Sequence, residues 1–332
     1  MLSVGSTLES KYRILKLLGE GGMSKVWLCE DEKGERFAIK EIDKSKPAFK
    51  ASQNEDKSLT EVEIIKELNH PLIPKVEEVY EDSESIKIVM ELVEGLDLMS
   101  ILAALKERGK RLEEEDIKRW AKELAEIFSY LHSRQDPIIY RDLKPSNIMI
   151  NKEGDVRLLD FGIAKYKSQV KEPVEKKYAG TNGFASPEHK KGCPDERSDI
   201  FTLGRTLYFL AAGGIPSSLK KTTLKDGSVV TRKEYKPVPF SEIEGARISP
   251  AFEKIIFRCM ENEPEDRYGS ASEILRGLMG LDKTKNKREI KEKSPLFKII
   301  ITIAITAIFV FTIFFLLIRF LGGGDISLLP SI

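Results

Sequence analysis

Cysteine is rare in this sequence, and neither sign of charge is in excess. The three cysteines, Cys29, Cys193 and Cys259, are far apart and odd in number. They give neither a disulfide framework nor the paired spacing of a zinc site, which favours a reducing compartment. The 54 basic and 53 acidic side chains leave a formal net charge of +1. Such a balance produces no overall field for nucleic acid, so we expect no nucleic-acid partner.

Long apolar runs are also absent, except near the C-terminal end. The first residues contain no apolar signal region, so we expect no secretory peptide. Residues 299–318, in contrast, are twenty residues without a charge. At about 1.5 Å per residue, a helix of this length spans roughly 30 Å, the hydrocarbon thickness of a bilayer. The sequence therefore predicts a transmembrane helix at 299–318, followed by a short extracytoplasmic tail at 319–332.

The flanks of this apolar run predict its orientation. Seven lysine and arginine residues lie between positions 283 and 298, whereas Arg319 is the one basic residue after the run. Basic flanks stay in the cytoplasm. We therefore expect a single-pass protein of the cell membrane, with the large N-terminal part cytoplasmic and the C-terminus outside. The basic juxtamembrane linker at 281–298 fits a solvated linker and a segment lying on anionic lipid equally well.

The sequence before this linker changes character near position 94. Residues 12–93 contain strand patterns between glycine-bearing turns, with one helical stretch at 59–68. From 94 to 280 apolar residues recur at helical spacing. We therefore predict an α+β fold with a small, mostly β lobe and a large, mostly α lobe. Later helices are expected at 197–213, 250–261 and 270–279.

Glycine clusters in the small lobe, in the stretch from Leu18 to Val26 (LGEGGMSKV). Glycines let the backbone of a turn approach an anionic ligand, although a plain turn explains the stretch equally well. The stretch lacks the lysine of a P-loop and lies between two strands, which disfavours P-loop and dinucleotide sites. Further along, Lys40 ends the apolar strand FAIK. A buried ammonium needs an anionic partner, with Glu61 and Glu63 as candidates, unless it snorkels to solvent.

Two motifs in the large lobe carry the residues that phosphoryl transfer needs. The first is Tyr140–Asn147 (YRDLKPSN), and the second is Leu158–Gly162 (LLDFG). In this order they provide a carboxylate for a hydroxyl proton, a lysine for phosphoryl charge, and oxygen ligands for Mg²⁺. Each residue alone fits a loop residue that satisfies local hydrogen bonds. The ordered set indicates phosphoryl transfer.

These motifs, over residues 12–280, resemble the eukaryotic-type protein kinase family, in particular its bacterial membrane-anchored serine/threonine members. The resemblance implies the two-lobed kinase fold, with an N-lobe at 12–93 and a C-lobe at 94–280. It implies ATP and Mg²⁺ as cofactors, protein serine and threonine hydroxyls as substrates, and self-association for autophosphorylation. Lys144 favours serine/threonine specificity, because tyrosine kinases usually differ at that place.

The resemblance assigns chemical roles to individual residues of the large lobe. Asp142 is the expected catalytic base, and Lys144 is the expected phosphate-balancing lysine. Asn147 and Asp160 are the expected magnesium ligands.

The implied ATP site draws on the glycine loop and on the hinge between the lobes. Lys40 matches the lysine that holds the α- and β-phosphates, with Glu61 as its helix partner. Met90 falls at the gatekeeper position. The full set expected to bind ATP comprises Leu18, Gly19, Gly21, Gly22, Val26, Ala38, Lys40, Met90, Glu91 and Val93.

Further matches lie around the activation segment, which begins at Ile163 and is closed by the stretch Ser186-Pro187-Glu188. Glu188 resembles the glutamate that closes this segment, with Arg267 as its partner. Asp199 resembles the aspartate that braces the catalytic loop, here the motif Tyr140–Asn147. A carboxylate that stabilises the start of a helix is an alternative role for Asp199. Thr181 lies where the family contacts the substrate residue and the catalytic aspartate.

The sequence departs from the family pattern in four places. Ser24 replaces the third glycine of the loop, and Tyr140 replaces the usual histidine. We expect the Tyr140 ring to pack beneath Phe161 and its hydroxyl to form a hydrogen bond. Ser168 is the one aliphatic hydroxyl in 163–180, so we hypothesise that loop phosphorylation matters less here or moves to Ser168 or Thr181. A polar insertion at 217–241, with the hairpin signal Asp226-Gly227, fits a surface loop or a docking surface.

Three functions compete at this point. The first is an active, membrane-tethered serine/threonine kinase. The second is a membrane-anchored pseudokinase that acts as a nucleotide-binding interaction module, which Tyr140 and the hydroxyl-poor segment would explain. The third is a membrane scaffold, which failure to bind Mg·ATP would favour. The intact Lys40, Asp142, Asn147 and Asp160 favour the first.

Overall fold

The computed structural model describes most of the chain before position 286. At 60–61, 218–223, 229–234 and 281–285 the description covers the backbone and leaves out the side chains. The predicted transmembrane helix at 299–318, the tail at 319–332 and most of the linker lie outside the described residues. Among the residues that are described, no helix combines the length and the apolar character needed to cross a membrane. The described ranges are 1–22, 24–46, 49, 60–170, 181–214, 218–223, 229–234 and 237–285.

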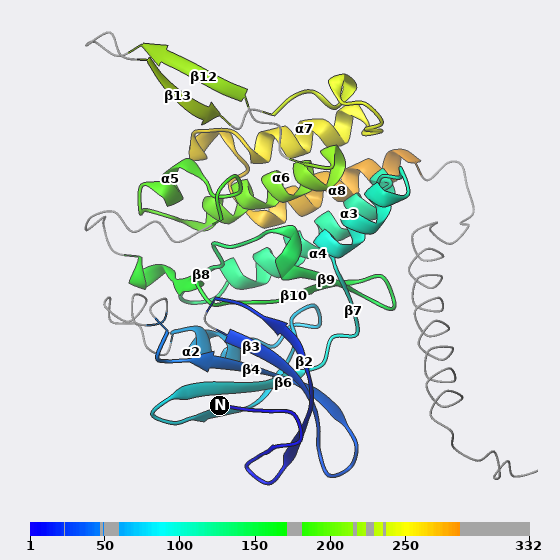
Figure 1. Ribbon diagram of the computed structural model, residues 1–332. Helices are drawn as coiled ribbons and strands as arrows, with labels where there is room; N and C mark the ends of the chain where they lie inside the picture. The colour runs from blue at the N-terminus through cyan, green and yellow to red at the C-terminus, as the bar shows by residue number, and fades with distance from the viewer. Residues whose placement is uncertain are drawn as a thin grey trace, which may run out of the picture.

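A six-stranded antiparallel sheet forms the small lobe (Figure 1). Its strands lie in the order β1-β2-β3-β4-β6-β5. The helix α2, at Thr60–Glu67, comes after β4 in the chain and lies against β5. The strands are β1 Thr7–Leu8, β2 Tyr12–Glu20, β3 Ser24–Glu30, β4 Arg36–Asp43, β5 Val76–Glu81 and β6 Ser85–Glu91.

The two faces of this sheet carry separate apolar cores because side chains alternate along each strand. On one face Ile39 of β4 lies opposite Val89 of β6, in a cluster with Tyr12 and Trp27. On the other face Ile42 lies opposite Ile86 in a second cluster, which also contains Val62 of α2. Lys40 shares the face of Ile42 by this alternation, and it therefore points to the side of the sheet that α2 covers.

In the residues that the structure describes, six helices build the large lobe, with α4 at its centre. Apolar residues of α4 recur every three or four positions, and Ile117, Trp120, Leu124 and Phe128 are all fully buried. The helices α6 and α8 pack against α4. In the described part of the chain the helices are α3 Leu98–Glu107, α4 Glu114–His132, α5 Pro187–Lys190, α6 Glu196–Ala212, α7 Pro250–Cys259 and α8 Ala271–Lys285.

The helix ends follow ordinary capping chemistry. Asp195 and Ser198 form a reciprocal capping box at the start of α6, which satisfies free N–H groups there. Gly213 ends α6 at φ +71°, a left-handed conformation that glycine adopts without strain. The observed α6, α7 and α8 overlap the three later helices that the sequence predicts.

Short strands at the boundary of the lobes place the catalytic segments. A three-stranded sheet in the order β10-β9-β7 and the pair β11-β8 lie between the small lobe and the helices (Figure 1). The 3₁₀ turn η1, Pro145–Asn147, connects directly to β9. These strands are β7 Gly95–Asp97, β8 Ile138–Ile139, β9 Ile148–Asn151, β10 Val156–Leu158 and β11 Lys165–Tyr166.

The polar insertion contains an antiparallel pair, β12 at Ser218–Thr223 and β13 at Val229–Glu234. The pair extends outward from the large lobe (Figure 1). It fits the predicted hairpin, although the turn residues Asp226 and Gly227 lie outside the described residues. After the pair, the backbone N–H of Val238 donates to the Tyr208 hydroxyl at 2.9 Å, which ties the chain back to α6.

Close packing of α6 against the end of α7 requires a glycine at position 204. A Cβ atom there would lie 2.6 Å from Cβ of Cys259 and 2.8 Å from Cγ of Met260. We expect Gly204→Ala to lower the free energy of unfolding by about 1–3 kcal/mol in urea denaturation, because the core must shift. Gly280→Ala on α8 is the matched control, since its Cβ would meet nothing within 4 Å. Equal stability of the two variants would contradict this account of α6.

Candidate active site

The Asp142 carboxylate is the centre of a compact group of polar side chains. Lys144 Nζ lies 2.7 Å from Asp142 Oδ2. Asn147 Nδ2 donates to the Asp142 backbone carbonyl at 2.9 Å and to Oδ2 at 3.1 Å. The motif YRDLKPSN thus folds back on itself through η1, which brings the predicted base, lysine and amide together.

A hydroxyl group already contacts this carboxylate. Thr181 Oγ1 donates to Asp142 Oδ1 at 2.8 Å, and Lys144 Nζ donates to the same hydroxyl at 3.1 Å. A carboxylate within hydrogen-bond reach of a hydroxyl has the geometry for accepting its proton. The ammonium group beside it can stabilise negative charge at the same place.

Asp160 contacts Lys40 across the boundary of the two lobes. Lys40 Nζ lies 2.8 Å from Asp160 Oδ1, and the Gly162 N–H donates to the same oxygen at 3.2 Å. The nearby Lys40 charge holds the pKa of the Asp160 carboxyl below its usual value. The residue therefore presents an anionic oxygen ligand, the type that Mg²⁺ prefers.

Asn147 suits the second ligand position for a cation. Its Nδ2 faces Asp142, so the oxygen of the same amide is the atom with which it could bind Mg²⁺. Among the described residues, no group of three or more His, Cys, Asp and Glu could form a protein-only metal cage. A site with few protein ligands is usual for Mg²⁺ that also binds phosphate.

The register of the small-lobe sheet gathers several predicted ATP-binding residues on one face. Val26 lies opposite Lys40, and Ala38 lies opposite Met90. Ala38 and Lys40 are two residues apart on β4, so all four share a face. Of the predicted loop residues, Leu18 and Gly19 lie at the end of β2, and Gly21 and Gly22 lie in its connection to β3. The Gly21 N–H donates to the Ser24 carbonyl at 2.8 Å.

The predicted hinge, Glu91 to Val93, connects β6 to the large lobe. The Glu91 N–H donates to the Lys75 carbonyl at 2.9 Å. The Glu91 carboxylate pairs with Arg157 of β10, so an ion pair joins the hinge to the large lobe. Arg157 was not predicted, since nothing in a short strand distinguishes it from a surface arginine.

The predicted partner of Lys40, Glu61, lies in α2. Its side chain is outside the description, so that prediction stays a prediction. The described partner of Lys40 is Asp160, from a segment 120 residues further along the chain.

Asp199 holds the catalytic loop in a strained conformation. Arg141 has a φ of +74°, which costs about 1–3 kcal/mol for a residue other than glycine. Asp199 is fully buried and accepts the backbone N–H of Tyr140 at 2.9 Å and that of Arg141 at 2.8 Å. His132 Nε2 lies 2.9 Å from the same carboxylate. Asp199 therefore braces the catalytic loop, in addition to lying in the first turn of α6.

Tyr140 joins the catalytic loop to the segment around Asp160. Its hydroxyl donates to the Leu159 carbonyl, and its ring meets Phe161 edge-on at 5.1 Å and 81°. This confirms the expected packing and hydrogen bond. Burial raises the pKa of Tyr140 well above its ordinary value, so the hydroxyl keeps its proton and remains a donor.

Removing this hydroxyl is expected to weaken the link. We predict that Tyr140→Phe lowers the free energy of unfolding by about 1–2 kcal/mol, because the partly buried Leu159 carbonyl loses its donor. Phosphoryl transfer should fall with it, measured with labelled ATP. Tyr140→His, which restores the residue usual in kinases, is the comparison and should retain transfer. A phenylalanine variant with unchanged stability and rate would contradict this role.

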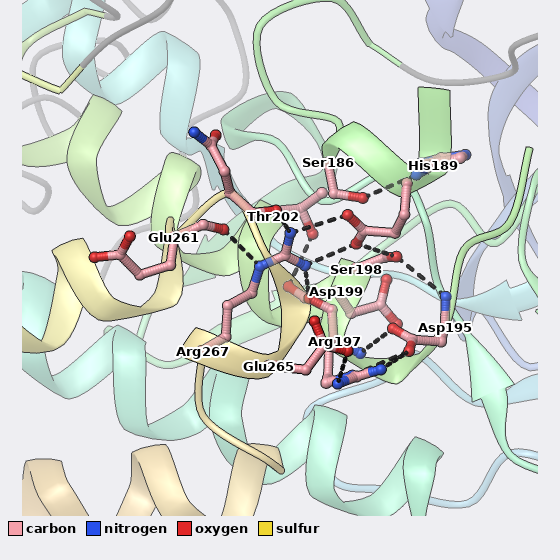
Figure 2. A network of polar contacts seen from close by, with 12 residues as sticks. Ser186, His189, Asp195, Arg197, Ser198, Asp199, Thr202, Glu261, Glu265 and Arg267 are labelled. Atoms are coloured by element: carbon pink, nitrogen blue, oxygen red, sulfur yellow. Dashed lines mark hydrogen bonds and ion pairs between the residues drawn. The ribbon is translucent and has the colours of Figure 1, made fainter. Parts of the chain in front are cut away.

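An ion pair closes the activation segment onto the large lobe (Figure 2). Arg267 donates to both carboxylate oxygens of Glu188, at 2.7 and 2.9 Å. Ser198 Oγ donates to Glu188 Oε1 at 2.6 Å. Burial raises the pKa of Glu188, but the hydrogen bonds from Arg267 and Ser198 lower it more, to about 2. Arg267 also donates to the carbonyls of Arg197, Glu261 and Asn262.

Two histidines near the catalytic loop were not singled out by sequence reasoning. His132 contacts Asp199, and Arg141 Nε donates to Nε2 of His189 at 3.2 Å. The chain has three histidines in all. Their rarity was the one signal that could have drawn attention to them.

Comparisons with known proteins agree with this geometry. A family model described as "Protein kinase domain" matches residues 12–277. The chain is 33% identical over 277 residues to the serine/threonine-protein kinase cds1 of Schizosaccharomyces pombe. That match covers 80% of this chain and 58% of the relative. It is 30% identical over 296 residues to the serine/threonine-protein kinase pkn3 of Myxococcus xanthus. That match covers 86% of this chain and 52% of the relative.

A third relative is the probable serine/threonine-protein kinase CA_C1728 of Clostridium acetobutylicum, 29% identical over 284 residues. That match covers 82% of this chain and 40% of the relative. The chain thus spans about half the length of the curated relatives that it matches. The family model covers most of the described residues, including both motifs of the large lobe, and the chain therefore belongs to the protein kinase family.

Proposed function

We propose that this protein transfers the γ-phosphoryl group of ATP to serine and threonine hydroxyls of other proteins. The observation that carries the proposal is the Thr181 hydroxyl, which donates to Asp142 at 2.8 Å beside the Lys144 ammonium. A substrate hydroxyl can take the same position between base and cation. The relatives named above are serine/threonine kinases by name.

The individual roles follow from the contacts of each side chain. Asp142 accepts the proton of the attacking hydroxyl, and Lys144 stabilises charge on the phosphoryl group. Lys40, on the face of the sheet that it shares with Val26 and Ala38, holds the phosphates of ATP. Asp160 and Asn147 would bind Mg²⁺, which neutralises phosphate charge when bound. Each role stays a proposal until its residue is replaced.

Transfer from labelled ATP tests this function. The full chain is incubated with Mg²⁺ and a hydroxyl-rich acceptor protein, and Lys40→Met serves as the control. Label should enter serine and threonine, and the control should lose it. Clear binding of Mg·ATP without transfer would instead support the nucleotide-binding interaction module.

We also propose that residues 299–318 tether the kinase to the cytoplasmic face of the cell membrane. The twenty uncharged residues and the basic flank before them support this. The full chain should stay in the membrane fraction after an alkaline wash. Two lysines in the run, Ile308→Lys with Phe311→Lys, should release it, because each charge costs about 2.5–3.5 kcal/mol at the centre of a membrane helix. A wild-type chain that washes off would refute the tether.

A further inference from the structure

The side chain of His189 contacts the catalytic loop from the end of the activation segment. His189 lies on α5 directly after Glu188. Its Nε2 accepts a hydrogen bond from Arg141 Nε at 3.2 Å. Both side chains are buried, with 2% of His189 and 7% of Arg141 exposed. The contact therefore joins two segments 48 residues apart, immediately before Asp142.

Arg141 is a strained residue held from two sides. Its φ of +74° lies in the left-handed region, which residues other than glycine adopt only when their surroundings determine it. Asp199 fixes its backbone N–H at 2.8 Å, and His189 fixes its guanidinium. The next peptide carries Asp142, so a change in either contact alters the direction of that carboxylate.

The position of His189 is itself well determined. Its backbone N–H donates to Ser186 Oγ at 3.1 Å, which caps α5. The neighbouring Glu188 is bound to Arg267 and Ser198 (Figure 2). His189 therefore presents its imidazole to Arg141 from a fixed point in the large lobe.

We propose that His189 is a positioning residue for Asp142, acting through Arg141. This inference rests on the proposed role of Asp142 as the base. Since Nε2 accepts the hydrogen bond, the neutral imidazole carries its proton on Nδ1. The Arg141 guanidinium therefore contacts an uncharged acceptor atom at the position of His189 Nε2.

Two amide variants of the full chain test the proposal. In His189→Gln the amide oxygen can reach the place of Nε2, whereas in His189→Asn, one methylene shorter, it reaches only the place of Nδ1. We expect kcat of the glutamine variant within about threefold of wild type. We expect a loss of about tenfold or more in the asparagine variant, because small misplacements of a catalytic group are costly. KM for ATP and the melting temperature should change little. Lys191→Gln, an exposed position at the end of α5, is the control.

Several outcomes would overturn the proposal. Equal kcat in the glutamine variant, the asparagine variant and wild type would do so. A change confined to KM for the acceptor protein would do so too, since it would assign His189 to substrate docking. If the asparagine variant does not fold, His189→Met fills the site without an acceptor nitrogen, and an unchanged kcat in it overturns the proposal. Asp142→Asn is measured alongside, because activity retained there would refute the role of Asp142 rather than that of His189.

Discussion

Asp142→Asn is expected to reduce phosphoryl transfer by about 10²–10⁴-fold, the usual contribution of a general base. The amide has nearly the shape of the carboxylate but cannot take the hydroxyl proton. Its NH₂ group would also face either the Lys144 ammonium and the Asn147 amide, which both donate to Oδ2, or the Thr181 hydroxyl, which donates to Oδ1. The loss should lie in kcat, measured at saturating Mg·ATP, while ATP binding persists.

Asp155→Asn is the matched control for this substitution. Asp155 lies in the turn between β9 and β10, where its backbone N–H donates to Asn151. The control should transfer phosphate at the wild-type rate. If Asp142→Asn also did so, the proton would have to leave by another route, and Asp142 would not be the base.

Arg267→Met is expected to be the most destabilising single change discussed here, lowering the free energy of unfolding by about 3–5 kcal/mol. The substitution leaves the partly buried Glu188 carboxylate without the arginine that donates to both of its oxygens (Figure 2). It also removes the donors to three backbone carbonyls. Chemical denaturation monitored by circular dichroism measures the loss.

Two comparisons test the cause of this loss. Adding Glu188→Gln to Arg267→Met should restore part of the stability, because the unpaired charge is then gone. Lowering the pH should weaken the same ion pair, because it protonates Glu188. The pKa of Glu188 is lowered from 4.5 to about 2 in the folded state, so this stability is present above pH 4.5 and is lost as pH falls towards 2. If the double variant were no more stable than Arg267→Met, the unpaired charge would not be the cause.

These contacts link the end of the activation segment to the catalytic carboxylate. Arg267 fixes Glu188, and the adjacent His189 contacts Arg141, which precedes Asp142. Asp199 braces the same loop from α6. Contacts from α5 and α6 thus converge on the two residues that precede the base.

Local patterns were sufficient to predict much of this arrangement. Asp142, Lys144 and Asn147 lie within one short motif, so their contacts follow from the turn η1. The family resemblance assigned Val26 and Ala38 to the ATP site, and the observed strand register places both on the face of Lys40. The kinase fold itself is confirmed by the match over residues 12–277.

Contacts between distant segments were predicted only where the family resemblance supplied them. The pairing of Glu188 with Arg267, and Asp199 as a brace, came from that source. The contacts of His189 with Arg141 and of Glu91 with Arg157 had no local signal, because each depends on how two lobes or two loops pack. The tether at 299–318 and the side chain of Glu61 stay predictions, since both lie outside the described residues.

The most direct test of the central claim uses acceptor peptides that differ at one position. Peptides with serine, threonine, tyrosine or alanine at that position are incubated with the full chain, Mg²⁺ and labelled ATP. We predict label in the serine and threonine peptides, none in the tyrosine and alanine peptides, and a loss of about 10²-fold or more in labelling with Asp142→Asn. Transfer to tyrosine, or transfer to serine at the wild-type rate in Asp142→Asn, would contradict the account.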